Sequence, residues 1–137
     1  MGFTTETRRH GGLDVKLEME CRVVLGAAIE VHRTLGPGLL ESLYTRCLAI
    51  EMEARGLHVR REVPIPIEYR GIRLEHGYRI DLLVNDAIII EVKSVLRLEP
   101  VFKAQLLTYL RLTGLQVGFI LNFNNTVLRQ GITRMVL

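Results

Sequence analysis

Residues 78–95 read YRIDLLVNDAIIIEVKSV, and this stretch decides the class of the fold. Two apolar runs, residues 78–84 and 87–95, flank the pair Asn85–Asp86, which is typical of a tight turn between antiparallel strands. Residues 87–90 are continuously apolar. We therefore expect the second run to be a central strand that is covered on both faces of its sheet.

Three charged side chains interrupt this apolar hairpin, namely Asp81, Glu91 and Lys93. If the paired positions sum to about 171, Asp81 faces Ile90 and lies beside Glu91. Glu91 and Lys93 are two residues apart, so both point to the same face of the strand. The hairpin therefore predicts that two carboxylates and one amine converge at one place.

Charge inside a buried strand is costly unless it is paired or binds a metal ion. One explanation is a structural ion pair between Lys93 and either carboxylate. Another is an exposed edge strand, against which the apolar run at residues 88–90 argues. We favour a third explanation, a site for Mg²⁺ or Mn²⁺, because these hard cations prefer carboxylate oxygens and keep several water ligands.

Regular elements are predicted on both sides of the hairpin. Helices are expected at residues 14–35 and 39–55, with a Gly-Pro-Gly break between them, and from Pro100 to Gly114. Strands are expected at residues 57–63, 65–69 and 116–122, with an edge strand at 132–137. A helix joins two of the central strands, which implies a parallel pair in a mixed sheet. The order predicts an α/β sandwich.

Length and composition suit one domain. We expect residues 1–12 of the 137 to form a flexible N-terminal tail and residues 13–137 to form a single domain. The net charge of +3 is compatible with a nucleic-acid partner. Cys21 and Cys47 lack metal-ligand spacing and are expected to be reduced thiols. No apolar run reaches the ~18 residues of a membrane span, and no secretion signal is visible, so we expect a cytoplasmic protein without a membrane partner.

Several motifs resemble those of a known superfamily. The pattern Asp81…Glu91-x-Lys93 resembles the core of the PD-(D/E)xK nucleases, although Ile80 stands where their name has Pro. Residues 38–44 read GLLESLY and match the motif of the bacterial GxxExxY family within that superfamily. Residues 26–38 (GAAIEVHRTLGPG), 105–109 (QLLTY) and 121–123 (LNF) resemble its first helix, its QxxxY helix and its late strand. The resemblance covers about residues 20–136.

The resemblance implies an α/β, restriction-endonuclease-like fold with a mixed β-sheet flanked by helices. It also implies that Asp81 and Glu91 are ligands of Mg²⁺ or Mn²⁺, with Glu41 as an additional acidic group at the same site. Lys93 would position or activate the attacking water and stabilise charge on the phosphate.

Five residues are open to simpler explanations. Glu41 lies in the first turn of its helix, where the helix dipole alone favours a carboxylate. Gln105 and Tyr109 share one helix face, which the resemblance places near the catalytic site, although a tyrosine there also fits a core position. Tyr44 is expected to pack in the core with a hydrogen-bonding hydroxyl. His32, at the end of a helix, is expected to be a C-terminal cap.

These features predict a metal-dependent nuclease that hydrolyses phosphodiester bonds, with DNA favoured over RNA. The candidates for contacting the nucleic-acid backbone are Arg60, Arg61, Arg70 and Arg73. Strong sequence specificity is not expected, because there is no zinc finger and no recognition helix rich in Asn, Gln and Arg. A homodimer would suit a duplex with two strands to cut. Two alternatives stay open: a catalytically inactive nuclease-fold module that binds nucleic acid or a protein, and a metal-dependent enzyme for a small phosphorylated molecule.

Overall fold

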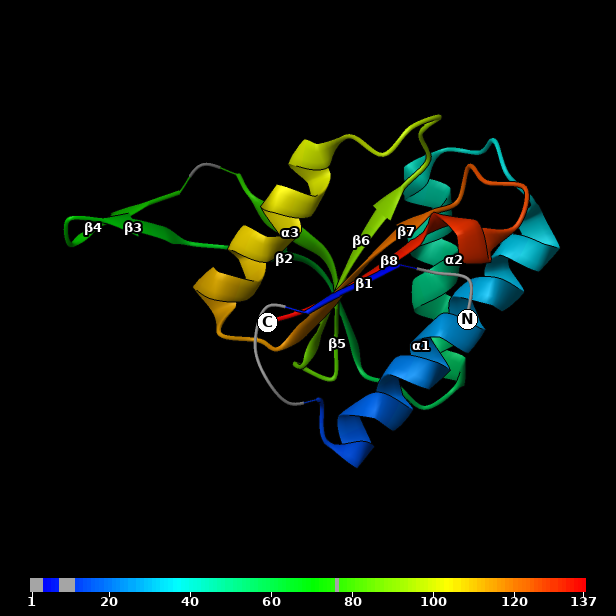
Figure 1. Ribbon diagram of the computed structural model, residues 1–137, viewed down its shortest axis with the longest axis horizontal. Helices are drawn as coiled ribbons and strands as arrows, with labels where there is room; N and C mark the ends of the chain where they lie inside the picture. Colours follow the sequence, from blue (N-terminus) through cyan, green and yellow to red (C-terminus); the bar gives the residue numbers. More distant parts are fainter. Residues whose placement is uncertain (1–3, 8–11, 76) are drawn as a thin grey trace.

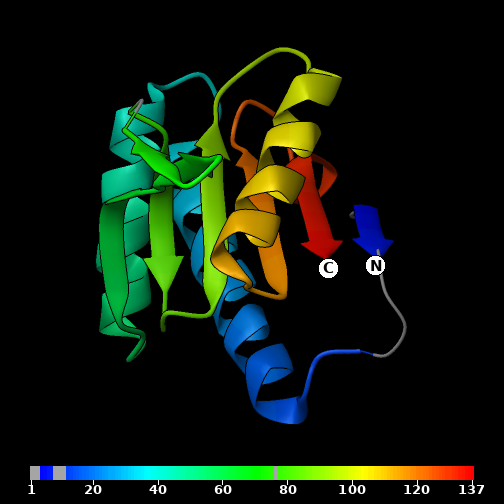
Figure 2. The ribbon, with the colours of Figure 1, turned by 90° about the vertical axis from the view of Figure 1, so that its left-hand side faces the viewer.

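The fold is built on a mixed six-stranded sheet with helices on both faces. The computed structural model describes residues 4–7, 12–75 and 77–137. The sheet has the order β1-β8-β7-β6-β5-β2, formed by β1 (Thr4–Thr7), β2 (Val59–Pro64), β5 (Arg79–Val84), β6 (Ile88–Lys93), β7 (Val117–Asn122) and β8 (Ile132–Val136). Helices α1 (Val15–Leu35) and α2 (Glu41–Ala54) cover one face, and α3 (Pro100–Thr113) covers the other (Figures 1 and 2). The predicted α/β architecture is confirmed.

Local chemistry explains where the helices begin and end. The carboxylate of Asp14 accepts a hydrogen bond of 2.8 Å from the backbone N–H of Leu17 and so caps the start of α1. Proline at the first position of α3 already has the backbone angle that a helix requires. Gly114 ends α3 in the left-handed conformation, with φ of 72°, which glycine adopts without steric strain.

Apolar side chains form a core on each face of the sheet. Ile88, Ile90 and Val92 of β6 belong to the core under α1 and α2. Ile89, between two of them, belongs to the core under α3, as the alternation of a strand requires. Strand β7 is buried throughout, and only Lys93 of β6 is partly exposed. The predicted parallel pairing of β6 with β7 is confirmed.

The β5–β6 hairpin differs from the prediction by one residue. Leu82 pairs with Ile90 and Val84 with Ile88, so the paired positions sum to 172 rather than about 171. The reason is that the turn spans three residues, 85–87, instead of two. The corrected register places Asp81 opposite Glu91 rather than opposite Ile90.

Two expectations about the ends of the chain are also corrected. Residues 1–12 were expected to be a tail, but Thr4–Thr7 form β1, which pairs in parallel with β8. The rest of that expectation, residues 1–3 and 8–11, lies outside the described residues. Because β1 lies outside β8, the strand at residues 132–136 is not the edge strand that was predicted.

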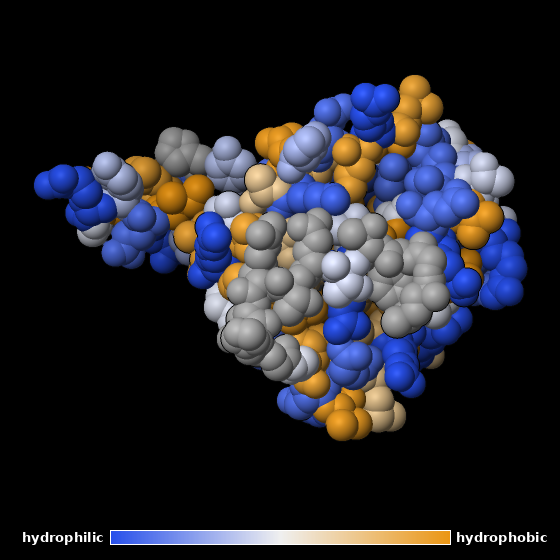
Figure 3. Space-filling model, viewed as in Figure 1, coloured by the Kyte–Doolittle hydropathy of each residue, from blue (hydrophilic) through white to orange (hydrophobic). Residues whose placement is uncertain are grey.

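The segment between β2 and β5 forms a separate hairpin. Strands β3 (Ile67–Tyr69) and β4 (Ile72–Leu74) pair only with each other in the described structure, around the predicted turn at Arg70–Gly71. The hairpin projects from the body of the molecule (Figure 1), and Figure 3 shows apolar and charged side chains mixed on its surface. None of the described helices is long and apolar enough to cross a lipid bilayer.

Candidate active site

The two acidic residues of the central hairpin lie opposite each other, one position beyond the last regular pair, Leu82 and Ile90. The backbone N–H of Asp81 donates to Oε2 of Glu91 at 2.9 Å, and the backbone N–H of Val92 donates to Oδ2 of Asp81 at 2.8 Å. Side-chain carboxylates therefore take over the hydrogen bonding where the regular pairing of β5 with β6 ends.

Burial makes this pair of carboxylates hard to ionise. Glu91 is only 5% exposed, and burial, followed by the negative charge of Asp81, raises its pKa to about 8. Burial also raises the pKa of Asp81, although the hydrogen bond from Val92 and the charge of Lys93 oppose this shift. A bound cation would favour the ionised form of both groups.

Lys93 lies on the α3 side of the sheet. Its Nζ is 4.3 Å from the centre of the Phe102 ring, a cation–π contact. Its charge opposes the raised pKa of both Asp81 and Glu91, so it lies within electrostatic range of both. No ion pair within 4.0 Å joins Lys93 to either carboxylate, all three residues being among those the structure describes. A structural ion pair therefore does not account for these charges.

Glu41 joins the start of α2 to the end of β6. Its Oε2 accepts a hydrogen bond of 3.1 Å from the backbone N–H of Ser94, the residue after Lys93. The hydroxyl of Ser94 donates in turn to the carbonyl of Leu39 at 2.7 Å. The charge of Glu41 also contributes to raising the pKa of Asp81 and Glu91. Glu41 thus lies beside the end of β6, and its hydrogen bond to Ser94 adds to the helix dipole in holding it there.

Tyr44 holds the loop that leads to Glu41. It is fully buried, its hydroxyl donates to the carbonyl of Gly36 at 2.5 Å, and the same oxygen accepts from the N–H of Leu39 at 3.1 Å. Its ring stacks on Phe123 with 4.5 Å between ring centres. The prediction of a packed tyrosine with a hydrogen-bonding hydroxyl is confirmed.

His32 does not cap its own helix as expected. Its Nε2 lies 2.7 Å from the backbone oxygen of Asn125, and the N–H of Gly36 bonds to its backbone carbonyl. The side chain therefore ties the end of α1 to the loop after β7.

Of the two predicted residues of α3, Tyr109 lies near the carboxylates and Gln105 lines a neighbouring hollow. Tyr109 is 4% exposed, and burial followed by the charges of Glu91 and Asp81 raises its pKa to about 12, which places it near the site. Gln105 lines a neighbouring apolar hollow between α3 and the base of the projecting hairpin, shared with Tyr109 and Tyr78. Among the described contacts, Gln105 makes no hydrogen bond to the carboxylates or to Lys93.

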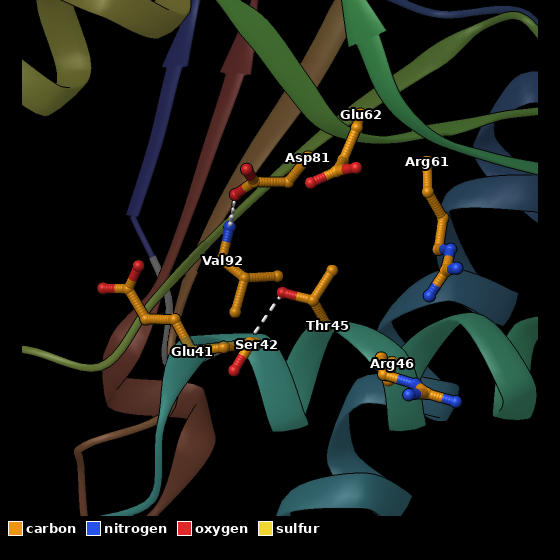
Figure 4. Close-up of a pocket in the computed structure, with 8 residues that line it drawn as sticks. All are labelled: Glu41, Ser42, Thr45, Arg46, Arg61, Glu62, Asp81 and Val92. Carbon is orange, nitrogen blue, oxygen red and sulfur yellow. Dashed lines mark hydrogen bonds between the residues drawn. The ribbon is translucent and has the colours of Figure 1, made fainter.

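A cavity of about 370 Å³ opens beside Asp81, between α2 and the sheet. This volume is within the range of ligand-binding sites. Figure 4 shows the residues that line it, which are Glu41, Ser42, Thr45, Arg46, Arg61, Glu62, Asp81 and Val92.

Two charged residues of this lining, Arg46 and Glu62, were not among the residues predicted from the sequence. Glu62 has φ of 51°, an unusual value for a residue with a side chain, and it lies between the regular pairs Arg61–Leu82 and Val63–Ile80, opposite Asp81. No sequence pattern indicates such a backbone conformation.

The four arginines predicted to contact nucleic acid are dispersed. Arg61 lines the cavity, whereas Arg60 pairs with Asp86 at 2.8 Å. Arg70 lies in the turn of the projecting hairpin, and Arg73 of β4 lies 3.7 Å from Glu75. The structure therefore brings one of the four to the candidate site.

The oxygen donors suit a hard divalent cation. Asp81 and Glu91 provide two carboxylates with raised pKa values that a cation would relieve. No group of three or more His, Cys, Asp or Glu side chains that could hold a metal ion occurs in the described ranges. Two protein carboxylates nevertheless fit Mg²⁺, which usually keeps several water ligands.

Fold and site together define an α/β protein with two acidic residues and a lysine on adjacent central strands. The family model described as the PD-(D/E)XK nuclease superfamily matches residues 18–135, and the chain belongs to this superfamily. Comparison with curated proteins and with solved structures found no match. Membership implies a nucleic-acid substrate, and nucleases of this superfamily usually use divalent metal ions.

Proposed function

We propose that this chain is a divalent-metal-dependent nuclease of the GxxExxY group that cuts DNA in preference to RNA, without strong sequence specificity. One observation carries the proposal. The carboxylates of Asp81 and Glu91 meet at the end of the regular β5–β6 pairing, with Lys93 two residues beyond Glu91 on the same strand face. The contact of Glu41 with Ser94 and the anchoring of its loop by Tyr44 support the GxxExxY assignment.

Each residue has a distinct part in this reaction. Asp81 and Glu91 would hold Mg²⁺ or Mn²⁺, which supplies positive charge and lowers the pKa of a bound water. The ammonium of Lys93 orients the attacking water and stabilises negative charge that develops on the phosphate. Such chemistry depends mainly on positioning and electrostatics, so few residues suffice.

Three further residues would act around this centre. Glu41 holds the backbone just after Lys93 through Ser94 and so positions the lysine. The hydroxyl of Tyr109 keeps its proton at neutral pH, because its pKa is about 12, and can donate a hydrogen bond to a carboxylate or a phosphate. Gln105 would act from the adjacent hollow on the bound strand rather than on the metal ligands.

Cleavage of plasmid DNA and of a matched RNA with Mg²⁺, with Mn²⁺ and with EDTA tests the proposal. We expect Asp81→Asn and Lys93→Ala each to lower the rate by about 10²-fold or more. The matched control is Asp86→Asn, since Asp86 lies in the exposed turn of the same hairpin. Equal rates for wild type and Asp81→Asn would contradict the proposed site.

Anomalous diffraction from crystals soaked in Mn²⁺ tests the metal site without a substrate. We expect a peak beside Asp81 and Glu91 in the wild type and none in Asp81→Asn. If the wild type neither cuts nucleic acid nor binds Mn²⁺, the chain is instead an inactive nuclease-fold module.

A further inference from the structure

The cavity beside Asp81 contains positive as well as negative side chains. Arg46 of α2 and Arg61 of β2 line it, and both are exposed. Within the described part of the chain, neither guanidinium group makes an ion pair or a hydrogen bond. By contrast, Arg55, directly after α2, pairs with Glu51 of that helix at 2.8 Å. Two cations without partners therefore lie in the cavity that holds the proposed catalytic carboxylate.

The charges in this cavity are separated by sign. Figure 4 shows the side chain of Arg61 extending from β2 toward α2, where Arg46 lies, while the carboxylates of Asp81 and Glu62 lie on the other side. One side of the cavity can thus attract a cation and the other an anion. A guanidinium group matches a phosphate particularly well, because its N–H donors form a planar fork.

We propose that Arg46 and Arg61 form a subsite for a backbone phosphate of the nucleic-acid strand, next to the phosphate that is cut at Asp81 and Glu91. This inference rests on the proposed nuclease function and deepens it. The subsite would fix how the strand lies in the active site, and it gives Arg46 a role that no sequence motif indicated. It also separates Arg61 from the adjacent Arg60, whose guanidinium is held by Asp86.

Binding to a short fluorescein-labelled DNA duplex, measured by anisotropy over a series of salt concentrations with Mg²⁺ present, tests the subsite. All proteins carry Lys93→Ala so that the duplex is not cut. Loss of one phosphate contact should make the negative slope of log K against log salt shallower by about 0.9. We expect this change for Arg46→Gln and for Arg61→Gln, together with an affinity loss of about tenfold.

Two kinds of control make the result specific. Arg33→Gln removes the same charge from an exposed i,i+3 ion pair on α1 and should leave slope and affinity unchanged. Arg46→Lys and Arg61→Lys keep a point charge without the fork, so they should keep the slope while losing affinity. Thermal unfolding of each variant shows that the fold is retained, and the lysine variants serve if a glutamine variant does not fold.

The outcomes separate the subsite from the nuclease function. If the wild type cuts DNA but the arginine variants bind with the slope of the Arg33→Gln control, the subsite is wrong and the nuclease function stands. If the arginine variants have a shallower slope of log K against log salt than the Arg33→Gln control, while the wild type does not cut, the subsite stands and the hydrolysis proposal is wrong. If the Lys93→Ala protein does not bind the duplex, the subsite is overturned.

Discussion

Burial raises the pKa of both carboxylates at the candidate site, Asp81 and Glu91. Each accepts a backbone N–H, yet burial and mutual repulsion still make ionisation unfavourable. Without a bound cation, ionising these two carboxylates therefore carries a free-energy cost in the folded protein. This cost depends on pH and on metal ions, so it can be measured without knowledge of the substrate.

The raised pKa of Glu91 predicts that the metal-free protein loses stability as pH rises. Its pKa is about 8 in the folded state and near 4.5 in the unfolded state, so the folded state binds the extra proton between these values. The free energy of unfolding should fall from pH 5 to pH 9 by an amount on the order of 3 kcal/mol that Glu91→Gln abolishes. Urea unfolding in EDTA measures this.

The control for this pH series is Glu53→Gln, on the exposed surface of α2. Adding Mg²⁺ should restore stability at pH 8 more than at pH 5, because protons compete with the metal for the same oxygens. A wild-type curve that runs parallel to that of Glu91→Gln would show that the carboxylate is not perturbed.

Glu62 illustrates backbone strain at the same site. Its φ of 51° is in the left-handed region, which costs a residue with a Cβ about 1 kcal/mol or more. We expect Glu62→Gly to exceed Glu62→Ala in free energy of unfolding by about 1 kcal/mol, since both remove the carboxylate and only glycine relieves the strain. Chemical denaturation compares the two, and an advantage for the alanine variant would contradict this conformation.

At the scale of the elements, the start of α2 determines where Glu41 lies. Residues 36–40 connect α1 to α2, and the Tyr44 hydroxyl bonds to both Gly36 and Leu39 within this loop. Ser94 then connects this loop to β6. Helix, loop and strand thus form one unit around the candidate site.

Tyr44→Phe should loosen this unit. The ring keeps its stacking on Phe123, but the Gly36 carbonyl and the Leu39 N–H lose their shared partner, which should cost about 1–2 kcal/mol of stability. Nuclease activity should fall as well, because Glu41 is less well held. Thermal unfolding and cleavage rates measure both effects. Tyr69→Phe, on the projecting hairpin, is the control and should change stability by less than about 0.5 kcal/mol.

For the whole molecule, the sheet is buried between helices on both faces, and α3 approaches β7 closely. Gly118 of β7 permits this approach: a Cβ there would lie 2.7 Å from Cδ1 of Leu106 and 3.3 Å from the carbonyl oxygen of Ile89. The absence of a side chain at Gly118 therefore lets Leu106 of α3 pack directly against β7.

Gly118→Ala should destabilise the protein by about 1–3 kcal/mol, because Leu106 of α3 must move away from the added methyl group. Gly12→Ala is the matched control, since a Cβ at Gly12 has no neighbour within 4 Å. Urea unfolding gives both values. Equal stability of the two variants would mean that Leu106 adjusts without moving the helix.

Much of the fold could be predicted because its determinants are local. Asp14, Pro100 and Gly114 act within a few residues of themselves, and their helix boundaries were predicted closely. The parallel pair of central strands followed from the helix that joins them. The hairpin register was wrong by one residue, because a single additional turn residue is invisible in an apolar run.

The sequence by itself determined the α/β class and the acidic pair with its lysine, since strand alternation and apolar runs depend only on spacing along the chain. Only the tertiary structure decided that Asp81 lies opposite Glu91, that β1 pairs with β8 at the edge of the sheet, and that Arg46 and Glu62 line the same cavity as Asp81. These features depend on contacts between residues far apart in the chain. Neither spacing nor composition records such contacts.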